Sequence, residues 1–307
     1  MSPLGRIVRL ALTFAAVAFV AWTAWDLADK WQSSEPVQLD WGLAVLATIP
    51  MALVALGQAI GWRSLLQHLV GKSLPWLATL DMLLASMLGR YMPAKAGMPA
   101  ILIARARDIE VPAPALAASL PIMAGVYAIL GMAIGLASLL ASAGGLPESL
   151  DWLRGPGMVL IAIGTLVALG IGLLVNRNLY PKFIIDKLQL SGEGPLLNLS
   201  FIAWFVMVWG CWWIHGVLVV VAFGGSWSDG LAAAGIFVLA PVIGFLALVA
   251  PGGIGVREAV IGQGLSSIIG SAAAASAGLV ARIASLGMDV LVWLVVRAIY
   301  RRSRVES

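Results

Sequence analysis

The stretch Pro251–Glu258 places ionisable side chains inside an otherwise apolar region. It reads Pro-Gly-Gly-Ile-Gly-Val-Arg-Glu, so helix-breaking residues come directly before Arg257 and Glu258. A helix that starts after the break presents backbone N–H groups whose positive partial charge favours anions. Arg257 adds a permanent charge on a planar group that suits a phosphate or a carboxylate. Glycines bring bare backbone close to whatever occupies such a site. The glycines here are Gly252, Gly253 and Gly255.

The neighbouring carboxylate has more than one interpretation. Glu258 could orient Arg257, pair with an arginine from elsewhere, or bind a cationic part of a ligand. The bland alternative is an Arg–Glu arrangement that only stabilises a helical hairpin. Ionisable groups at membrane depth are costly and are functional candidates by default, so we predict a binding role.

Two further pairs of charged residues are candidates. Arg90 and Lys95 flank a second Pro-containing break, where they could contact a substrate or extend to headgroups at the membrane surface. Arg282 lies about two helical turns before Asp289, so both are predicted on one helix face. An arginine within a span needs a partner, and Asp289 or Glu258 could provide it. Asp81 is a weaker candidate.

The residues that could hold a metal or perform catalysis are few. Cys211 is the single cysteine, which excludes an intramolecular disulfide and a cysteine-rich zinc site. His68 and His215 lie in different segments, and we interpret His215 as an interhelical hydrogen-bonding group rather than a proton relay. No nucleophile–base pair is recognisable. We therefore expect no cofactor, no metal and no enzymatic activity.

The composition determines the class of protein. Hydrophobic residues make up 61% of the 307 positions and charged residues 11%, whereas soluble domains carry about 25% charged residues. The chain is therefore predicted to be an all-α polytopic membrane protein. The first apolar run has no small-residue cleavage site after it, so we expect an anchor and not a removed signal peptide. No basic tract indicates nucleic acid binding.

Apolar runs of bilayer length predict six full transmembrane helices. Two other apolar regions are interrupted by Pro and Gly and are predicted to be broken re-entrant hairpins. The spans are 7–25, 41–62, 114–140, 158–175, 198–223 and 275–299, and the re-entrant regions are 76–104 and 231–270. A full crossing by 231–249 is the alternative, but it would disturb the charge pattern that follows.

Lysines and arginines in short loops predict the orientation. Arginines precede the first span and follow the last, while the loop at 26–40 is acidic. The charges alternate if both broken regions enter and leave on the same side, which places both termini in the cytoplasm. The second half then repeats the order of the first from the opposite face, as in the inverted repeats of transporters. The predicted domains are a first repeat at 1–140, a linker at 141–157 and a second repeat at 158–307.

The motif at Pro251–Glu258 resembles the PGGxGxRE signature of the lysylphosphatidylglycerol synthase/flippase-like membrane family. The block that begins at Gln58 and continues through Trp62-Arg63, and the block Gly89-Arg90-Tyr91-x-Pro93-x-Lys95, resemble two further blocks of that family. The family includes the membrane domain that flips aminoacylated phosphatidylglycerol. Full-length synthases carry an aminoacyl-transferase domain after the membrane part; this chain stops at Ser307, so the resemblance implies transport without synthesis.

These observations lead to one favoured hypothesis. We expect a multi-pass flippase or lipid transporter in the bacterial inner membrane, for an anionic phospholipid, an aminoacylated lipid or a lipid-linked glycan precursor. Arg257, Arg90 and Lys95 would hold an anionic headgroup, and Glu258 or Asp289 could bind a cationic part or orient the arginines. The alternative is a non-transporting partner that presents lipid to a separate transferase. A homodimer and proton coupling are left open.

Overall fold

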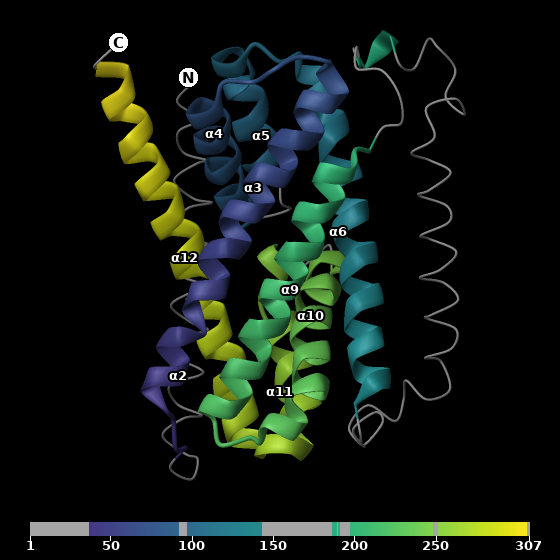
Figure 1. Ribbon diagram of the computed structural model, residues 1–307, viewed down its shortest axis with the longest axis vertical. Helices are drawn as coiled ribbons and strands as arrows, with labels where there is room; N and C mark the ends of the chain where they lie inside the picture. Colours follow the sequence, from purple (N-terminus) through teal and green to yellow (C-terminus); the bar gives the residue numbers. More distant parts are fainter. Residues whose placement is uncertain are drawn as a thin grey trace, which may run out of the picture.

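The computed structural model describes residues 37–91, 97–142, 186–188, 190, 197–247 and 251–305. Within these ranges the protein is helical and contains no β-strand (Figure 1). The long helices are α2 (Trp41–Leu46) with α3 (Thr48–Val70), α6 (Ala113–Ala141), α9 (Leu199–Ala222), α10 (Gly230–Leu246) and α12 (Ser271–Val305). The shorter elements are α4 (Trp76–Leu88), η1 (Gly89–Tyr91), α5 (Gly97–Arg105), η3 (Ala106–Ile109), η6 (Trp227–Asp229), η7 (Pro251–Gly253) and α11 (Val256–Ile269).

Five helical segments among the described residues are long and apolar enough to cross a membrane. Four of them correspond to the predicted spans 41–62, 114–140, 198–223 and 275–299. The predicted spans 7–25 and 158–175, and nearly all of the linker at 141–157, lie outside the described residues. The fifth segment, Trp227–Leu246, falls in the region that we predicted to be re-entrant. Its 20 residues also satisfy the alternative of a full crossing.

Small residues and buried polar groups determine how the helices pack. A Cβ on Gly235 of α10 would come within 2.9 Å of the Gly135 carbonyl oxygen of α6, so these helices touch along their backbones. The Trp62 indole of α3 donates to the Ser119 hydroxyl of α6 at 2.8 Å, and both side chains are fully buried. Membrane helices lack a hydrophobic driving force toward one another, so such close packing and hydrogen bonds hold the bundle together.

The two broken regions lie toward opposite ends of the molecule. In Figure 1, α4 and α5 occupy the upper part and α11 the lower part. Their breaks nevertheless meet, because a Cβ on Gly252 of η7 would lie 2.8 Å from the Tyr91 ring of η1. The candidate site is built around this contact.

Candidate functional site

The break before α11 has the conformation that its glycines predict. Gly252, Gly253 and Gly255 all have positive φ, at 58°, 69° and 83°, where a side chain would be strained. The chain then enters α11, and the Glu258 carboxylate accepts a hydrogen bond from the Gly255 N–H at 2.7 Å. This bond satisfies one of the free N–H groups at the start of the helix. One role of Glu258 is therefore to cap α11.

The same break lies tightly against α10. A Cβ on Gly253 would come within 2.8 Å of the Gly244 backbone, and a Cβ on Gly244 would come within 2.4 Å of Cγ of Arg257. Any side chain at either glycine would push the two segments apart. The glycines thus fix the position from which the Arg257 side chain extends.

Arg90 and Asp289 form the central ion pair of the site. The Arg90 guanidinium donates to Oδ2 of Asp289, and the Tyr91 hydroxyl donates to the same oxygen at 2.8 Å. The Asp289 side chain is only 6% exposed. A buried carboxylate needs such partners because burial penalises an unpaired charge. The pair joins η1 to α12.

Arg282 connects α12 to the second break. Its Nη1 donates to the Gly252 carbonyl oxygen at 3.1 Å, and its Nε lies 3.7 Å from Oε1 of Glu258. The guanidinium also lies 5.2 Å from the centre of the Tyr91 ring, at cation–π distance. The sequence offered Asp289 or Glu258 as the partner of Arg282, and the structure selects Glu258.

Arg257 has a different environment. Its residue is 9% exposed, and its guanidinium lies 4.9 Å from the centre of the Trp212 ring. Among the described residues it forms no ion pair, and its buried Nε has no hydrogen-bond partner. The cluster therefore contains three arginines and two carboxylates among the described residues, which leaves one net positive charge. The arginines are Arg90, Arg257 and Arg282, and the carboxylates are Glu258 and Asp289. This imbalance favours an anionic ligand.

A cavity of about 90 Å³ opens at this cluster. One water occupies roughly 10–15 Å³ of such a cavity, so there is room for several waters or a small headgroup fragment. Arg90 and Arg257 both line it, as does Gly252, and most of the remaining wall is methionine and aromatic. A low-dielectric wall of this kind strengthens the field of the two guanidiniums. The cavity is thus suited to an anion with apolar surroundings.

Gln58 and Tyr127 also line this cavity, and our sequence reasoning gave neither a role in binding. Gln58 is 5% exposed. Neither the Gln58 amide nor the Tyr127 hydroxyl forms a side-chain hydrogen bond with another described residue. The family-like block that begins at Gln58 was the only signal that singled out this residue.

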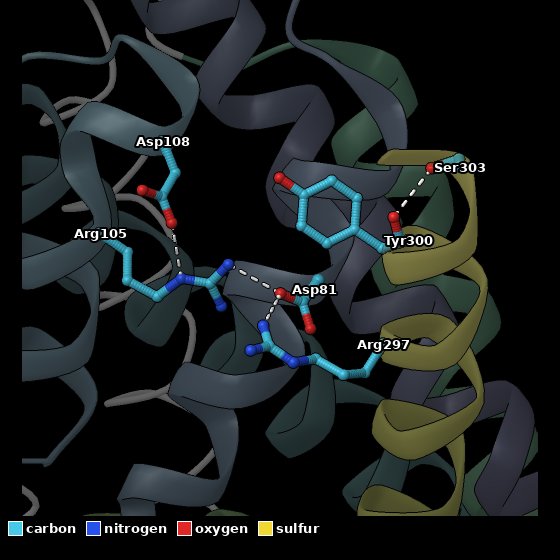
Figure 2. A network of polar contacts seen from close by, with 6 residues as sticks. All are labelled: Asp81, Arg105, Asp108, Arg297, Tyr300 and Ser303. Carbon is cyan, nitrogen blue, oxygen red and sulfur yellow. Dashed lines mark hydrogen bonds and ion pairs between the residues drawn. The ribbon is translucent and has the colours of Figure 1, made fainter. Parts of the chain in front are cut away.

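Asp81 belongs to a separate network (Figure 2). Its fully buried carboxylate accepts hydrogen bonds from Arg105 and Arg297, each at 2.7 Å, while Arg105 also donates to Asp108 at 2.9 Å. Burial lowers the pKa of Arg105, but its bonds to Asp108 and Asp81 outweigh burial and raise the pKa above its ordinary value. Asp81 does not line the cavity, so the structure does not bring this weaker candidate to the site.

The other predicted residues are placed as follows. Lys95 lies outside the described residues. The His215 Nδ1 lies 2.8 Å from the Ala47 carbonyl oxygen, which confirms the predicted interhelical hydrogen bond. Arg63 lies within α3, which continues to Val70 beyond the predicted span end at 62; it donates to the Leu74 carbonyl, and its guanidinium lies 4.5 Å from the centre of the Trp76 ring. Within the described ranges no cluster of three or more His, Cys, Asp or Glu could hold a metal ion.

Comparison with protein families identifies the family of this chain. A family model described as the lysylphosphatidylglycerol synthase TM region matches residues 6–292, which is most of the chain. A search of curated proteins found no match.

Proposed function

The chain belongs to the lysylphosphatidylglycerol synthase transmembrane-region family, and on that premise we propose that it moves a lipid with an anionic headgroup across the membrane. The family supports a lipid-related function in a membrane. One observation carries the proposal further: Arg90 and Arg257, from the two separate breaks, line one cavity. Arg257 has no carboxylate partner among the described residues, so it is available to a ligand anion.

The arrangement of the breaks supports transport over simple lipid binding. We interpret 76–104 and 231–270 as re-entrant hairpins of an inverted repeat, because their breaks meet while their helices lie toward opposite ends (Figure 1). In such transporters the binding site lies near the bilayer midplane, where two broken helices meet. A headgroup held by Arg90 and Arg257 could then be exposed to either side in turn. The acyl or prenyl chains would stay in the lipid.

The proposed setting is the bacterial inner membrane. We place both termini in the cytoplasm, because arginines flank the two ends of the chain. Neither an enzymatic activity nor a cofactor forms part of the proposal.

Transbilayer lipid movement in proteoliposomes tests the proposal. Acyl-labelled phosphatidylglycerol is incorporated into phosphatidylcholine vesicles, and dithionite quenching reports the lipid that reaches the outer leaflet. Arg257→Ala should lower the protein-dependent rate about tenfold or more, because a hydrogen bond to a charged group contributes about 1.5–3 kcal/mol. Arg301→Ala is the matched control, because Arg301 lies exposed at the end of α12. An unchanged rate for Arg257→Ala would overturn the assignment.

One other function has a distinct outcome in the same experiment. If the purified protein retains phosphatidylglycerol but moves it no faster than protein-free vesicles do, the transporter proposal fails. A partner that presents lipid to a separate transferase would then be the better description.

A further inference from the structure

The wall of the cavity carries cationic and neutral polar groups but no acidic ones. Among the described lining residues are two arginines, Gln58 and Tyr127, and neither an aspartate nor a glutamate. A headgroup bound here meets two guanidiniums, and Asp289, the carboxylate paired with Arg90, does not line the cavity. A protonated amine on that headgroup would lie close to like charges, which is unfavourable in a low-dielectric site.

The nearby carboxylates are already occupied. Oδ2 of Asp289 accepts from both Arg90 and Tyr91, and its side chain is 6% exposed. Glu258 accepts from the Gly255 N–H and lies 3.7 Å from Arg282. Recruiting either carboxylate for a ligand amine would remove a partner from a buried or part-buried arginine. Of the two roles that we considered for these acids, the contacts support orientation of the arginines.

Gln58 contributes a neutral polar group to the cavity wall that the arginines also line. Its residue is 5% exposed and lines the cavity, yet its amide makes no hydrogen bond with another described side chain or backbone group. A buried amide normally finds a partner, because leaving its donors and acceptor unsatisfied costs free energy. The amide oxygen and the amide nitrogen of Gln58 are therefore not fully enclosed by protein, and both are open to neighbouring space. That space is the cavity.

Resting on the proposed function, we propose that the substrate is a lipid phosphate whose headgroup bears hydroxyl groups and no amine. The arginines bind the phosphate, and the Gln58 amide selects the headgroup by hydrogen bonding its hydroxyls. An amide can donate and accept at once, as a hydroxyl can, so the two groups match. A glycerol phosphate and a sugar phosphate share this chemistry.

The first arm of the test needs no variant. Wild-type protein is reconstituted in phosphatidylcholine vesicles with one acyl-labelled probe at a time: phosphatidylglycerol, or its lysyl ester, whose amines are protonated at neutral pH. We expect phosphatidylglycerol to move about tenfold faster. Equal or faster movement of the lysyl ester overturns this inference but leaves the proposed function standing. Failure of both probes to exceed the protein-free rate overturns both.

The second arm isolates Gln58. Phosphatidic acid carries a phosphate but no alcohol hydroxyl on its headgroup, so the ratio of the phosphatidylglycerol rate to the phosphatidic acid rate reports the contact with the glycerol hydroxyls. Gln58→Leu should lower this ratio about fivefold, the equivalent of one neutral hydrogen bond of about 1 kcal/mol, while the phosphatidic acid rate is retained. An unchanged ratio contradicts the role of Gln58.

A further variant changes the charge at residue 58. Gln58→Glu adds an acid to the cavity wall and should raise the rate for the lysyl ester relative to that for phosphatidylglycerol, which a folding defect would not do. An unchanged ratio of the two rates counts against Gln58 as the selecting residue.

A labelled polyprenyl phosphate sugar, compared with phosphatidylglycerol, identifies which hydroxyl-bearing headgroup the cavity prefers. Movement of either one faster than the lysyl ester supports the proposed class.

Discussion

Arg90 of η1 is paired with Asp289 of α12, although 199 residues separate them in the chain. A second tie joins the same two regions, because Arg297 of α12 donates to the buried Asp81 of α4 at 2.7 Å (Figure 2). Rotation of the first predicted repeat against the second would have to break both ion pairs. A movement that keeps α12 together with α4 and η1 leaves them intact and is therefore less costly.

Removing the charge of Asp289 should destabilise the protein. Asp289→Asn leaves Arg90 without its carboxylate, and we expect a loss of about 2–4 kcal/mol, since breaking a buried pair from one side leaves an uncompensated charge. The melting temperature in detergent measures this loss. Tyr91→Phe is the matched milder change, because it removes one hydrogen bond to the same oxygen and should cost about 1–2 kcal/mol. Equal melting temperatures for Asp289→Asn and wild type would contradict the pairing.

The Asp81 network gives a second stability prediction with an internal control. Asp81→Asn leaves Arg105 and Arg297 facing a neutral buried group, so we expect a loss of about 3–5 kcal/mol. Asp108→Asn breaks a bond to the same Arg105, but Asp108 is 44% exposed and should contribute only about 0–1 kcal/mol. Thermal unfolding of the two variants side by side measures the difference. A larger effect at Asp108 would show that burial does not determine the strength of this network.

Much of this arrangement follows from the sequence, and the rest depends on distant contacts. The spacing of Arg282 and Asp289 predicted one shared face, and both do lie at the cluster. They do not pair with each other, because their partners come from other elements, Glu258 and Arg90. Spacing along a single helix carries no information about such partners.

Gln58 shows a second limit of the sequence. A glutamine in an apolar run is compatible with a hydrogen-bonded helix contact and with an unpaired group in a cavity. Only the positions of Arg90, Arg257 and Tyr127 from other elements show that Gln58 faces a shared space. The motif singled out Gln58, and the role that we propose for it depends on the packing of distant helices.

The glycines of the second break can be separated by substitution. Gly252→Ala combines an unfavourable φ of 58° with a Cβ 2.8 Å from the Tyr91 ring, whereas Gly255→Ala has an unfavourable φ of 83° and open space around the Cβ. We expect about 1–2 kcal/mol of backbone strain at Gly255. At Gly252 we expect about 1–3 kcal/mol more, because the added carbon also overpacks the contact. Melting temperatures of the two variants give the comparison, and a smaller loss at Gly252 would contradict the contact between the breaks.

The form of the charge at residue 257 should also affect transport. Arg257→Lys keeps a positive charge but loses the planar fork and the stacking 4.9 Å over the Trp212 ring. If the guanidinium both binds the phosphate in a bidentate manner and rests on Trp212, lysine should recover only part of the rate lost in Arg257→Ala. We expect an intermediate value, about three- to tenfold below wild type in the vesicle assay, since cation–π contacts contribute about 0.5–2 kcal/mol. Trp212→Leu removes the stacking surface alone and should fall in the same range. Full activity of Arg257→Lys would mean that a point charge is sufficient at this position and that the planar geometry of the arginine has no part in binding.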